Sequence, residues 1–289
     1  MQNIVVTGAS SGIGRATVAR LASESYRVFA GVRQDSDARS LKEEFGDAVV
    51  PLMIDVTDEA SIRAAAAHVA QEAGTNGLAG LVNNAGVGIA CPLEYLPVAE
   101  LRKQFEVNVF GQLSVTQAML PAIRQARGRI INIGSIGDRL TMPFAGALCA
   151  SKSAVASLNE ALRQELFPFG IHVCLIEPAS ICTKAVDKLV AENKARIAVM
   201  PPEVARRYGT QFLNFTETAL SQEKHGSPAS VVADAIYLAL TSPNPRTRYL
   251  CGKKSRLLAA LAALLPDPLF DALRRKLFAL PKQFGSLKD

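Results

Sequence analysis

The sequence contains no tryptophan, three histidines and five cysteines, and each scarcity excludes a class of protein. The cysteines form no C-x-x-C pair and the histidines do not cluster with them, so we expect neither a zinc site nor a disulfide framework. This pattern favours reduced thiols in a cytoplasmic protein without metal. With no strip of interleaved aromatic and basic residues, nucleic acid is not an expected partner. No apolar run reaches the roughly 20 residues that a membrane-spanning helix needs.

The 289-residue chain has enough apolar material for a large core, since 49% of its residues are hydrophobic. The net charge of +6 is moderate, and lysine and arginine are dispersed except near the C-terminus. No Gly/Pro/Ser-rich linker divides the chain. We therefore expect one domain over residues 1–252, with a substrate lid at about 185–225, and an amphipathic C-terminal extension over residues 253–289. The first residues predict a β-strand rather than a signal peptide.

Short Val/Ile-rich runs alternate with longer stretches that carry apolar residues at helical spacing. The runs expected to be strands are residues 4–7, 27–30, 49–54, 80–83, 129–133 and 172–177. The stretches expected to be helices are residues 14–23, 61–73, 101–126 and 151–167. This alternation predicts an α/β protein with a three-layer, doubly wound parallel sheet, in other words a Rossmann fold. Ligands of such sheets bind at the carboxyl ends of the strands.

A glycine-rich segment, TGASSGIG at residues 7–14, follows the first expected strand and opens the first helix. Glycines allow a tight turn there and let the backbone approach a pyrophosphate at the positive end of the helix. The spacing of Gly8, Gly12 and Gly14 resembles that of the short-chain dehydrogenase/reductase family, and differs from the G-x-G-x-x-G of other Rossmann enzymes. The segment predicts a dinucleotide site.

The second expected strand is followed by Arg33, and no acidic residue precedes Asp35. NAD-dependent enzymes usually carry an acid at this point to bind the ribose hydroxyls, whereas a guanidinium suits a 2′-phosphate. The sequence therefore favours NADP(H) over NAD(H), with Ser10 and Arg15 as supporting residues. The alternative is that Arg33 is a solvated surface residue.

Further motifs extend the resemblance over residues 3–183, with steroid- and retinol-type members as the nearest pattern. They are Asp55-Val56, the NNAG segment at 83–86, Asn108, Ser135, Lys152, the PASICT segment at 178–183 and, more loosely, the P-x-x-R-Y pattern at 245–249. The resemblance implies that Asn108, Ser135 and Lys152 serve catalysis. It implies cofactor contacts from Gly8, Ser10, Ser11, Gly12, Ile13, Gly14, Arg33, Asp55, Val56, Asn83, Ala85, Gly86, Lys152, Pro178, Ala179, Ile181 and Thr183. Ala179 stands where the family carries glycine.

Leu148 stands where the family's Tyr-x-x-x-Lys segment has its tyrosine, four residues before Lys152 and so on the same helix face. Leucine has no exchangeable proton, and no tyrosine lies between Tyr95 and Tyr208. Three explanations stay open: catalysis with water or another side chain such as Cys149 or Tyr208, NADP(H) binding without turnover as a regulatory or sensor protein, and deliberate replacement. We expect an enzyme of low activity, with impaired proton transfer and intact cofactor binding.

The substrate side is expected to be apolar. Residues 185–225 contain Tyr208, Phe212 and Phe215, which either line a pocket or pack the lid onto the domain. A lipophilic alcohol or ketone is the expected substrate. For the amphipathic stretches at 257–265 and 271–280, packing is favoured over a peripheral membrane contact. By resemblance alone, the protein is expected to be a homodimer or homotetramer.

Overall fold

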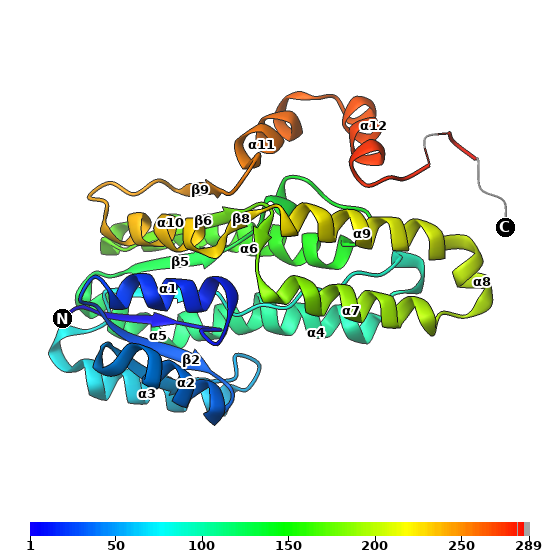
Figure 1. The fold of residues 1–289 in the computed structure, drawn as a ribbon. Coiled ribbons are helices and arrows are strands. Elements are labelled where there is room, and N and C mark those ends of the chain that lie inside the picture. Colours follow the sequence, from blue (N-terminus) through cyan, green and yellow to red (C-terminus); the bar gives the residue numbers. More distant parts are fainter. Residues whose placement is uncertain (282, 286–289) are drawn as a thin grey trace.

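The structure, a computed structural model, describes residues 1–281 and 283–285, without the side chains of 184–188. Of the predicted C-terminal extension, residues 282 and 286–289 lie outside the described residues. Seven parallel strands form one sheet, in the order β3-β2-β1-β4-β5-β6-β9 (Figure 1). In that order their bounds are Val49–Met53, Arg27–Val32, Asn3–Val6, Gly80–Asn83, Arg129–Ile133, His172–Pro178 and Arg248–Cys251. The predicted three-layer Rossmann fold is confirmed.

Helices cover both faces of the sheet. The helices of the described chain are α1 (Gly12–Ala22), α2 (Asp35–Phe45), α3 (Glu59–Ala73), α4 (Val98–Phe105), α5 (Gln112–Ala126), α6 (Gly146–Leu166), α7 (Lys184–Ala198), α8 (Pro202–Val204), α9 (Thr210–Lys224), α10 (Ala229–Thr241), α11 (Ser255–Leu264) and α12 (Asp267–Leu277). Ile4 and Val6 of β1 join the core beneath α1, α2 and α10, whereas Val5 joins the core beneath α3 and α5. This alternation follows from the two-residue period of a strand.

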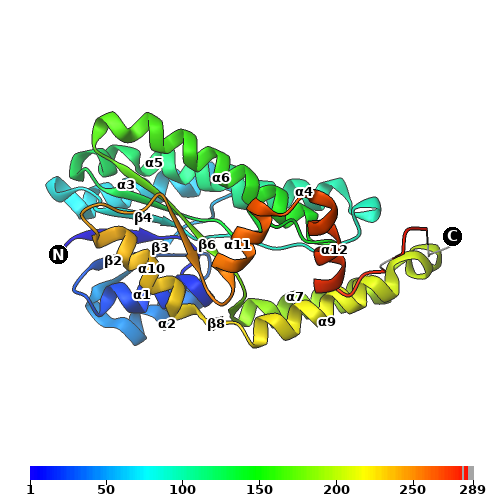
Figure 2. The same ribbon diagram turned by 90° about the horizontal axis from the view of Figure 1, so that it is seen from above.

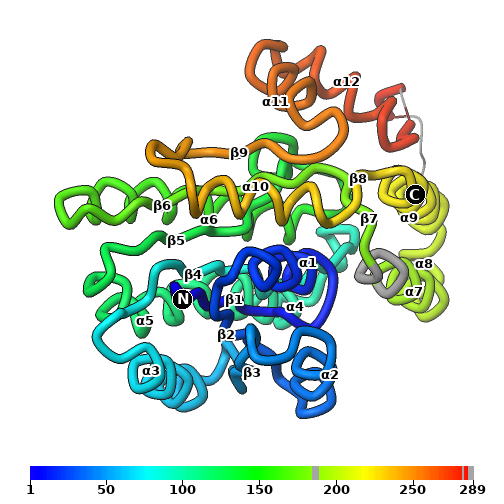
Figure 3. The backbone as a smooth tube through the Cα atoms, turned by 60° about the vertical axis from the view of Figure 1, so that its left-hand side comes forward, coloured from blue at the N-terminus to red at the C-terminus, as the bar shows by residue number. Residues whose placement is uncertain are grey.

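The segments near the C-terminus lie outside these layers. Helices α7 and α9 run side by side at one end of the molecule, past the carboxyl ends of the strands (Figures 1 and 2). A two-stranded pair joins β7 (Ile181–Cys182) to β8 (Ser227–Pro228), at the two ends of this helical segment. Helices α11 and α12 stand beyond β9 (Figure 3). The sequence predicted neither α2 nor α10 nor strand β9.

The helix predicted over residues 101–126 is interrupted by a π-helical segment, Glu106–Gly111. A π-helical segment inserts one extra residue per turn and often marks a functional position. Here it turns Asn108 into the interior, where the side chain is 1% exposed. Gly111, the last residue of the π-helical segment, packs closely on the loop after β3, since a Cβ there would lie 2.5 Å from the carbonyl oxygen of Val56.

Buried amides connect the middle of the sheet to two helices. Asn83 Nδ2 on β4 donates to Asn132 Oδ1 on β5 at 2.9 Å and to Thr116 Oγ1 on α5 at 2.8 Å. Asn132 Nδ2 in turn donates to Asn159 Oδ1 on α6 at 3.0 Å. Each residue is at most 2% exposed, so water cannot replace a lost partner. Asn132 is the centre of this network.

We predict that Asn132→Ala lowers the free energy of unfolding by about 1–3 kcal/mol, because it removes one of the two acceptors of the buried Asn83 amide and the donor to Asn159 Oδ1. Urea unfolding followed by circular dichroism measures this loss. Asn76→Ala, at an exposed position, serves as the control and should change the free energy by less than about 0.5 kcal/mol. Equal effects of the two substitutions would contradict the structural role of the network.

Candidate active site and cofactor cradle

The turn between β1 and α1 requires its glycines. Gly8 and Gly12 have φ angles of 64° and 54°, in the left-handed region where side chains other than glycine are strained. At Gly14 the limit is space, since a Cβ would lie 2.2 Å from the Gly8 carbonyl oxygen and 2.6 Å from Asn84 Nδ2. Helix α1 therefore packs directly on the backbone of the turn.

The N-terminus of α1 presents unused hydrogen-bond donors. Among the described residues, no acceptor binds the backbone N–H groups of Gly12, Ile13 and Gly14, and the Ser11 side chain does not cap the helix. Thr183 flanks this end, because a Cβ on Gly12 would lie 3.6 Å from its Cβ and Cγ2 atoms. Free N–H groups at the positive end of a helix form a binding site for a phosphate. These residues therefore fit the pyrophosphate of a dinucleotide.

Arg33, directly after β2, is exposed, and within the described part of the chain no hydrogen bond or ion pair engages its guanidinium. Arg15 differs from it: its Nε donates to Glu44 Oε2 at 3.0 Å and its Nη2 to Ser40 Oγ at 3.0 Å. Ser10 meets Arg15 through its carbonyl oxygen. Of the two arginines that the sequence assigned to a 2′-phosphate, Arg33 makes no hydrogen bond within the described residues, although its charge helps to lower the pKa of the Asp55 carboxyl group.

Asp55 follows β3 at the same edge of the sheet. Its Oδ1 accepts from the Thr57 backbone N–H at 2.9 Å and from Thr57 Oγ1 at 2.7 Å. The backbone hydrogen bond contributes most to a lowered pKa of this carboxyl group, which is therefore ionised at neutral pH. The carboxylate can accept a further hydrogen bond through Oδ2. The neighbouring Val56 is buried.

The NNAG segment has two roles. The Asn83 side chain belongs to the buried network beneath the sheet, so only its backbone lies at the strand end. Asn84, which the sequence did not single out, donates from Nδ2 to the carbonyl oxygens of Thr7 at 2.9 Å and Gly8 at 3.0 Å. It thereby fixes the glycine turn. The second asparagine of the motif is the sequence signal that pointed to it.

The next two residues of the segment are held by backbone and side-chain contacts. Ala85 N–H donates to Thr7 Oγ1 at 3.0 Å, so the threonine joins the two loops. A Cβ on Gly86 would lie 3.3 Å from Asn108 Oδ1. The Asn108 amide also bonds the Val87 backbone, accepting from its N–H at 2.8 Å and donating to its carbonyl at 2.9 Å. The asparagine thus holds the loop after β4.

Lys152 and Ser135 lie at the carboxyl end of β5. Lys152 Nζ donates to the carbonyl oxygen of Ile133 at 2.6 Å, and burial lowers the pKa of this ammonium group to about 8. Ser135 Oγ accepts from the Gly137 N–H at 3.0 Å, which leaves its own proton available to a substrate oxygen. Lys152 thus bonds the backbone two residues before Ser135, so both predicted residues lie at the same strand end.

Leu148 lies in the first turn of α6 and is half-buried. A Cβ on Gly88, in the loop after β4, would lie 3.7 Å from its Cδ2 atom. Its carbonyl oxygen accepts from Ser151 Oγ at 2.8 Å, and Ser151 Oγ accepts from Asn108 Nδ2 at 3.0 Å. The sequence missed Ser151, whose only signal is its place just before Lys152.

The two side chains considered as substitutes for the tyrosine are engaged elsewhere. Cys149 is buried, its Sγ accepts from the Met142 N–H at 3.4 Å, and burial raises the pKa of its thiol. Tyr208 donates its hydroxyl to Glu94 Oε2 at 2.6 Å and packs edge-on against Phe144. Neither contact directs a proton donor toward Lys152.

The segment after β6 forms the last part of the candidate cofactor site. Ala179 N–H donates to the Cys251 carbonyl oxygen at 2.9 Å, and Ala179 does not adopt a positive φ, so alanine fits where the family carries glycine. Pro178 is buried at the end of β6, and Ile181 is 4% exposed in β7. Thr183 follows and reaches α1.

Aromatic side chains pack between α6, α9 and α12. The Phe144 ring lies 5.4 Å from that of Phe212 and 5.6 Å from that of Phe215, measured between centroids. Phe278, just after α12, lies 5.7 Å from Phe215 and is 3% exposed. Phe212 and Phe215 therefore pack this segment onto the domain. Within the described residues, histidine, cysteine and acidic side chains form no metal-binding group, and no helix could cross a membrane.

The profile of the short chain dehydrogenase family matches residues 2–194. The chain belongs to this family. The 17-beta-hydroxysteroid dehydrogenase type 6 of Rattus norvegicus is 35% identical over 275 residues, which are 93% of this chain and 86% of that protein. An NADPH-dependent 3-dehydrocapnine reductase of Ornithobacterium rhinotracheale is 34% identical over 278 residues, which are 94% and 96% of the two chains.

A solved structure of a short chain dehydrogenase from Burkholderia cenocepacia in complex with NADP is also similar. It superposes with a TM-score of 0.70 at 27% identity, covering 96% of this chain and 99% of that one. The predicted family is thus confirmed, and steroid dehydrogenases are among the homologues. The family uses a nicotinamide cofactor, and the residues of the cradle fit one.

We predict that Gly14→Ala destabilises the protein by about 1–3 kcal/mol and abolishes nucleotide binding, because the new methyl group would displace α1 from the turn. Thermal unfolding with and without NADPH measures both effects. Gly209→Ala is the matched control, since its Cβ would meet only Ala205 Cβ at 3.9 Å. A Gly14→Ala protein that NADPH still stabilises as it does the unsubstituted protein would refute this role of the glycine.

Proposed function

We propose that the chain is an NADP(H)-dependent oxidoreductase for a lipophilic alcohol or ketone, and that Leu148 slows its proton transfer. The observation that carries the proposal is the N-terminus of α1, with three free N–H groups beside Thr183. Arg33, which follows β2 and makes no hydrogen bond within the described residues, supports a preference for the phosphorylated cofactor. The NADPH-dependent relative and the NADP-bound structure point the same way.

In this proposal, the free N–H groups of α1 and Thr183 hold the pyrophosphate. Arg33 binds the 2′-phosphate through charge-assisted hydrogen bonds, and Asp55 accepts from the adenine amino group. A nicotinamide ring held in this way would supply the hydride chemistry of the reaction. Because no acid follows β2 before Asp35, no carboxylate repels the 2′-phosphate there or binds the ribose hydroxyls of NAD(H) in its place.

Ser135 donates its hydroxyl proton to the substrate oxygen and so orients it. The Lys152 ammonium group, whose pKa is about 8, is mostly charged at neutral pH and can bind a ribose hydroxyl. Leu148 offers no proton between them, so water must complete the transfer. Loss of a positioned general acid typically costs about 10²- to 10⁴-fold in rate, which predicts slow turnover rather than none.

The apolar side of the site supports a lipophilic substrate. Phe144, Met142 and Met200 pack around the lid helices, and one relative is a hydroxysteroid dehydrogenase. Helix α12 turns Phe270 inward and is followed by the buried Phe278, which supports packing rather than membrane contact for this part of the extension. We further propose a homodimer or homotetramer formed through α5 and α6, as the family resemblance implies.

Arg33→Ala should weaken NADPH binding about 10- to 100-fold and leave NADH binding unchanged, because it removes a charge-assisted contact that only the 2′-phosphate makes. Fluorescence titration of both nucleotides measures the two dissociation constants. The control is Arg39→Ala, which removes an exposed arginine of α2 that bonds the Asp35 carbonyl oxygen. Unaltered NADPH affinity in Arg33→Ala would rule out this assignment of the phosphate site.

Leu148→Tyr should raise turnover of a ketone panel with NADPH about 10²- to 10⁴-fold and change the NADPH dissociation constant less than about threefold. Leu148→Phe introduces the ring without the hydroxyl and should show no gain. The two variants together separate proton donation from a change of shape. Equal rates in the unsubstituted protein and in Leu148→Tyr would mean that another group already donates the proton.

A further inference from the structure

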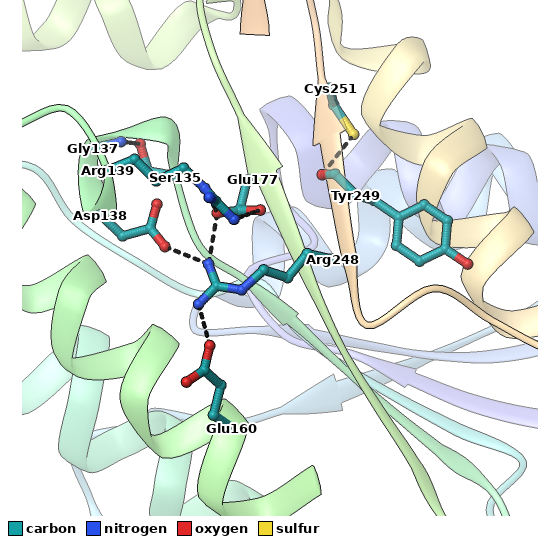
Figure 4. A network of polar contacts seen from close by, with 9 residues as sticks. All are labelled: Ser135, Gly137, Asp138, Arg139, Glu160, Glu177, Arg248, Tyr249 and Cys251. Atoms are coloured by element: carbon teal, nitrogen blue, oxygen red, sulfur yellow. Dashed lines mark hydrogen bonds and ion pairs between the residues drawn. The ribbon is translucent and has the colours of Figure 1, made fainter. Parts of the chain in front are cut away.

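A cluster of charged side chains lies beside Ser135 and has no part in the proposed cofactor site. It consists of Asp138, Arg139, Glu160, Glu177 and Arg248, here called the ion cluster (Figure 4). Asp138 ends the 3₁₀ turn Ile136–Asp138, Glu160 lies on α6, Glu177 on β6 and Arg248 on β9. Four separate segments of the chain meet at this point, since Arg139 directly follows Asp138.

Arg248 is the centre of the ion cluster. Its Nη1 donates to Asp138 Oδ2 at 2.9 Å and to Glu177 Oε1 at 2.8 Å, and its Nη2 donates to Glu160 Oε1 at 2.5 Å. Arg139 also binds Glu177, from Nε to Oε1 at 2.7 Å and from Nη2 to Oε2 at 3.3 Å. Because Asp138 and Glu177 accept from the same nitrogen atom, their carboxyl groups are neighbours.

The charges of the ion cluster do not balance. Three carboxyl groups face two guanidinium groups, and only Glu160, with 54% of its side chain exposed, is well solvated. The side chains of Glu177 and Asp138 are 0% and 4% exposed. Among the other neighbours, Cys149 on α6 and Cys251 on β9 have pKa values raised by burial and bring no positive charge. Arg163 acts on the exposed Glu160 and Arg274 acts on Cys149, whereas the charges that act most on Asp138 are those of Glu177 and Arg248. A surplus buried negative charge is strongly unfavourable unless a proton removes it.

One atom indicates where that proton sits. Asp138 Oδ1 is buried, and no donor among the described residues reaches it. A carboxylate oxygen in this state loses its hydration without replacement, whereas a protonated carboxyl group can donate to its neighbour. Burial, the charge of Glu177 and a hydrogen bond with Glu177 raise the pKa of Asp138 to about 6.

We propose that Asp138 and Glu177 share one proton and, together with Arg248, act as positioning residues for Ser135. The connection to Ser135 is short. The Asp138 N–H donates to the Ser135 carbonyl oxygen at 3.1 Å, and the Gly137 N–H donates to Ser135 Oγ at 3.0 Å. The ion cluster thus holds Asp138, the last residue of the Ile136–Asp138 turn. The N–H of Gly137 in the same turn orients the hydroxyl group of Ser135. The effect on turnover rests on the proposed function, whereas the shared proton does not.

The sign of the pH dependence follows from the raised pKa. The folded state holds the Asp138 proton more tightly than the unfolded chain, where the ordinary pKa is 3.8. The stabilisation is therefore fully present below about pH 4 and is lost as the pH rises through about 6. A displacement of this size changes the folding equilibrium constant on the order of a hundredfold across that range.

Asp138→Asn tests the proposal, because the amide imitates the protonated carboxyl group and does not titrate. Urea unfolding between about pH 4 and pH 8 should show a larger fall in stability in the unsubstituted protein than in Asp138→Asn. The part of the fall that remains in Asp138→Asn comes from Glu223, whose pKa burial raises to about 7. Infrared difference spectra should show a protonated carboxyl band that disappears near pH 6 in the unsubstituted protein and is missing from Asp138→Asn, whereas the band of Glu223 disappears near pH 7 in both proteins. Glu160→Gln is the matched control, since it removes the exposed acid on the same arginine and should leave the fall and the band in place.

Asp138→Leu tests whether the hydrogen bonds of the carboxyl group matter or only its volume, because leucine fills the space but bonds neither Arg248 nor Glu177. It should be less stable than Asp138→Asn at every pH. In the Leu148→Tyr background, Asp138→Leu should lower kcat at least tenfold with the NADPH dissociation constant unchanged, and Asp138→Asn should restore most of it. An Asp138→Asn protein that keeps the full pH dependence of the unsubstituted protein, or is as unstable as Asp138→Leu, would overturn the proposal. An inactive Leu148→Tyr protein that still binds NADPH and shows the titration would contradict the proposed function alone.

Discussion

The approach of α1 to the backbone of the β1–α1 turn is the contact on which the rest of the structure depends. Only glycine fits at position 14, because a Cβ there would collide with the Gly8 carbonyl oxygen. Asn84, directly after β4, donates a hydrogen bond to the same carbonyl oxygen. The contact sets the position of the free N–H groups at the start of α1. Thr183 flanks these N–H groups, and Arg33 follows β2 at the carboxyl edge of the sheet, where ligands of such folds bind.

The fold and most of the site were predictable because both depend on short segments. Strands β4 and β5 begin and end where the Val/Ile runs predicted, and the glycine spacing marked the turn. The π-helical segment at Asn108 was not predictable, since it depends on contacts with Val87 and Ser151 far away in the sequence. The same reason applies to the separate fates of Arg15 and Arg33: Glu44 and Ser40 decide which arginine is free, and their positions follow from the packing of α2.

Two features of the site concern protons: a proton donor is missing beside Lys152, and a proton is held beside Ser135. In the proposed function, Leu148 stands where another side chain would exchange a proton next to Lys152. The ion cluster, in contrast, brings two acids together on one arginine beside Ser135, an arrangement that a proton stabilises. Its arginine belongs to β9, a strand that the sequence did not predict, although the P-x-x-R-Y pattern contains Arg248 and Tyr249. Tyr249 supports that strand by accepting from the Arg246 N–H at 2.9 Å.

The central claim is that the edge of the sheet at α1 holds a phosphorylated dinucleotide irrespective of the rate of turnover. Isothermal titration of the unsubstituted protein with NADPH and, separately, with NADH tests it most directly. The account predicts saturable binding of one NADPH per chain, tighter than the binding of NADH. Absence of heat and of saturation with both nucleotides would contradict it.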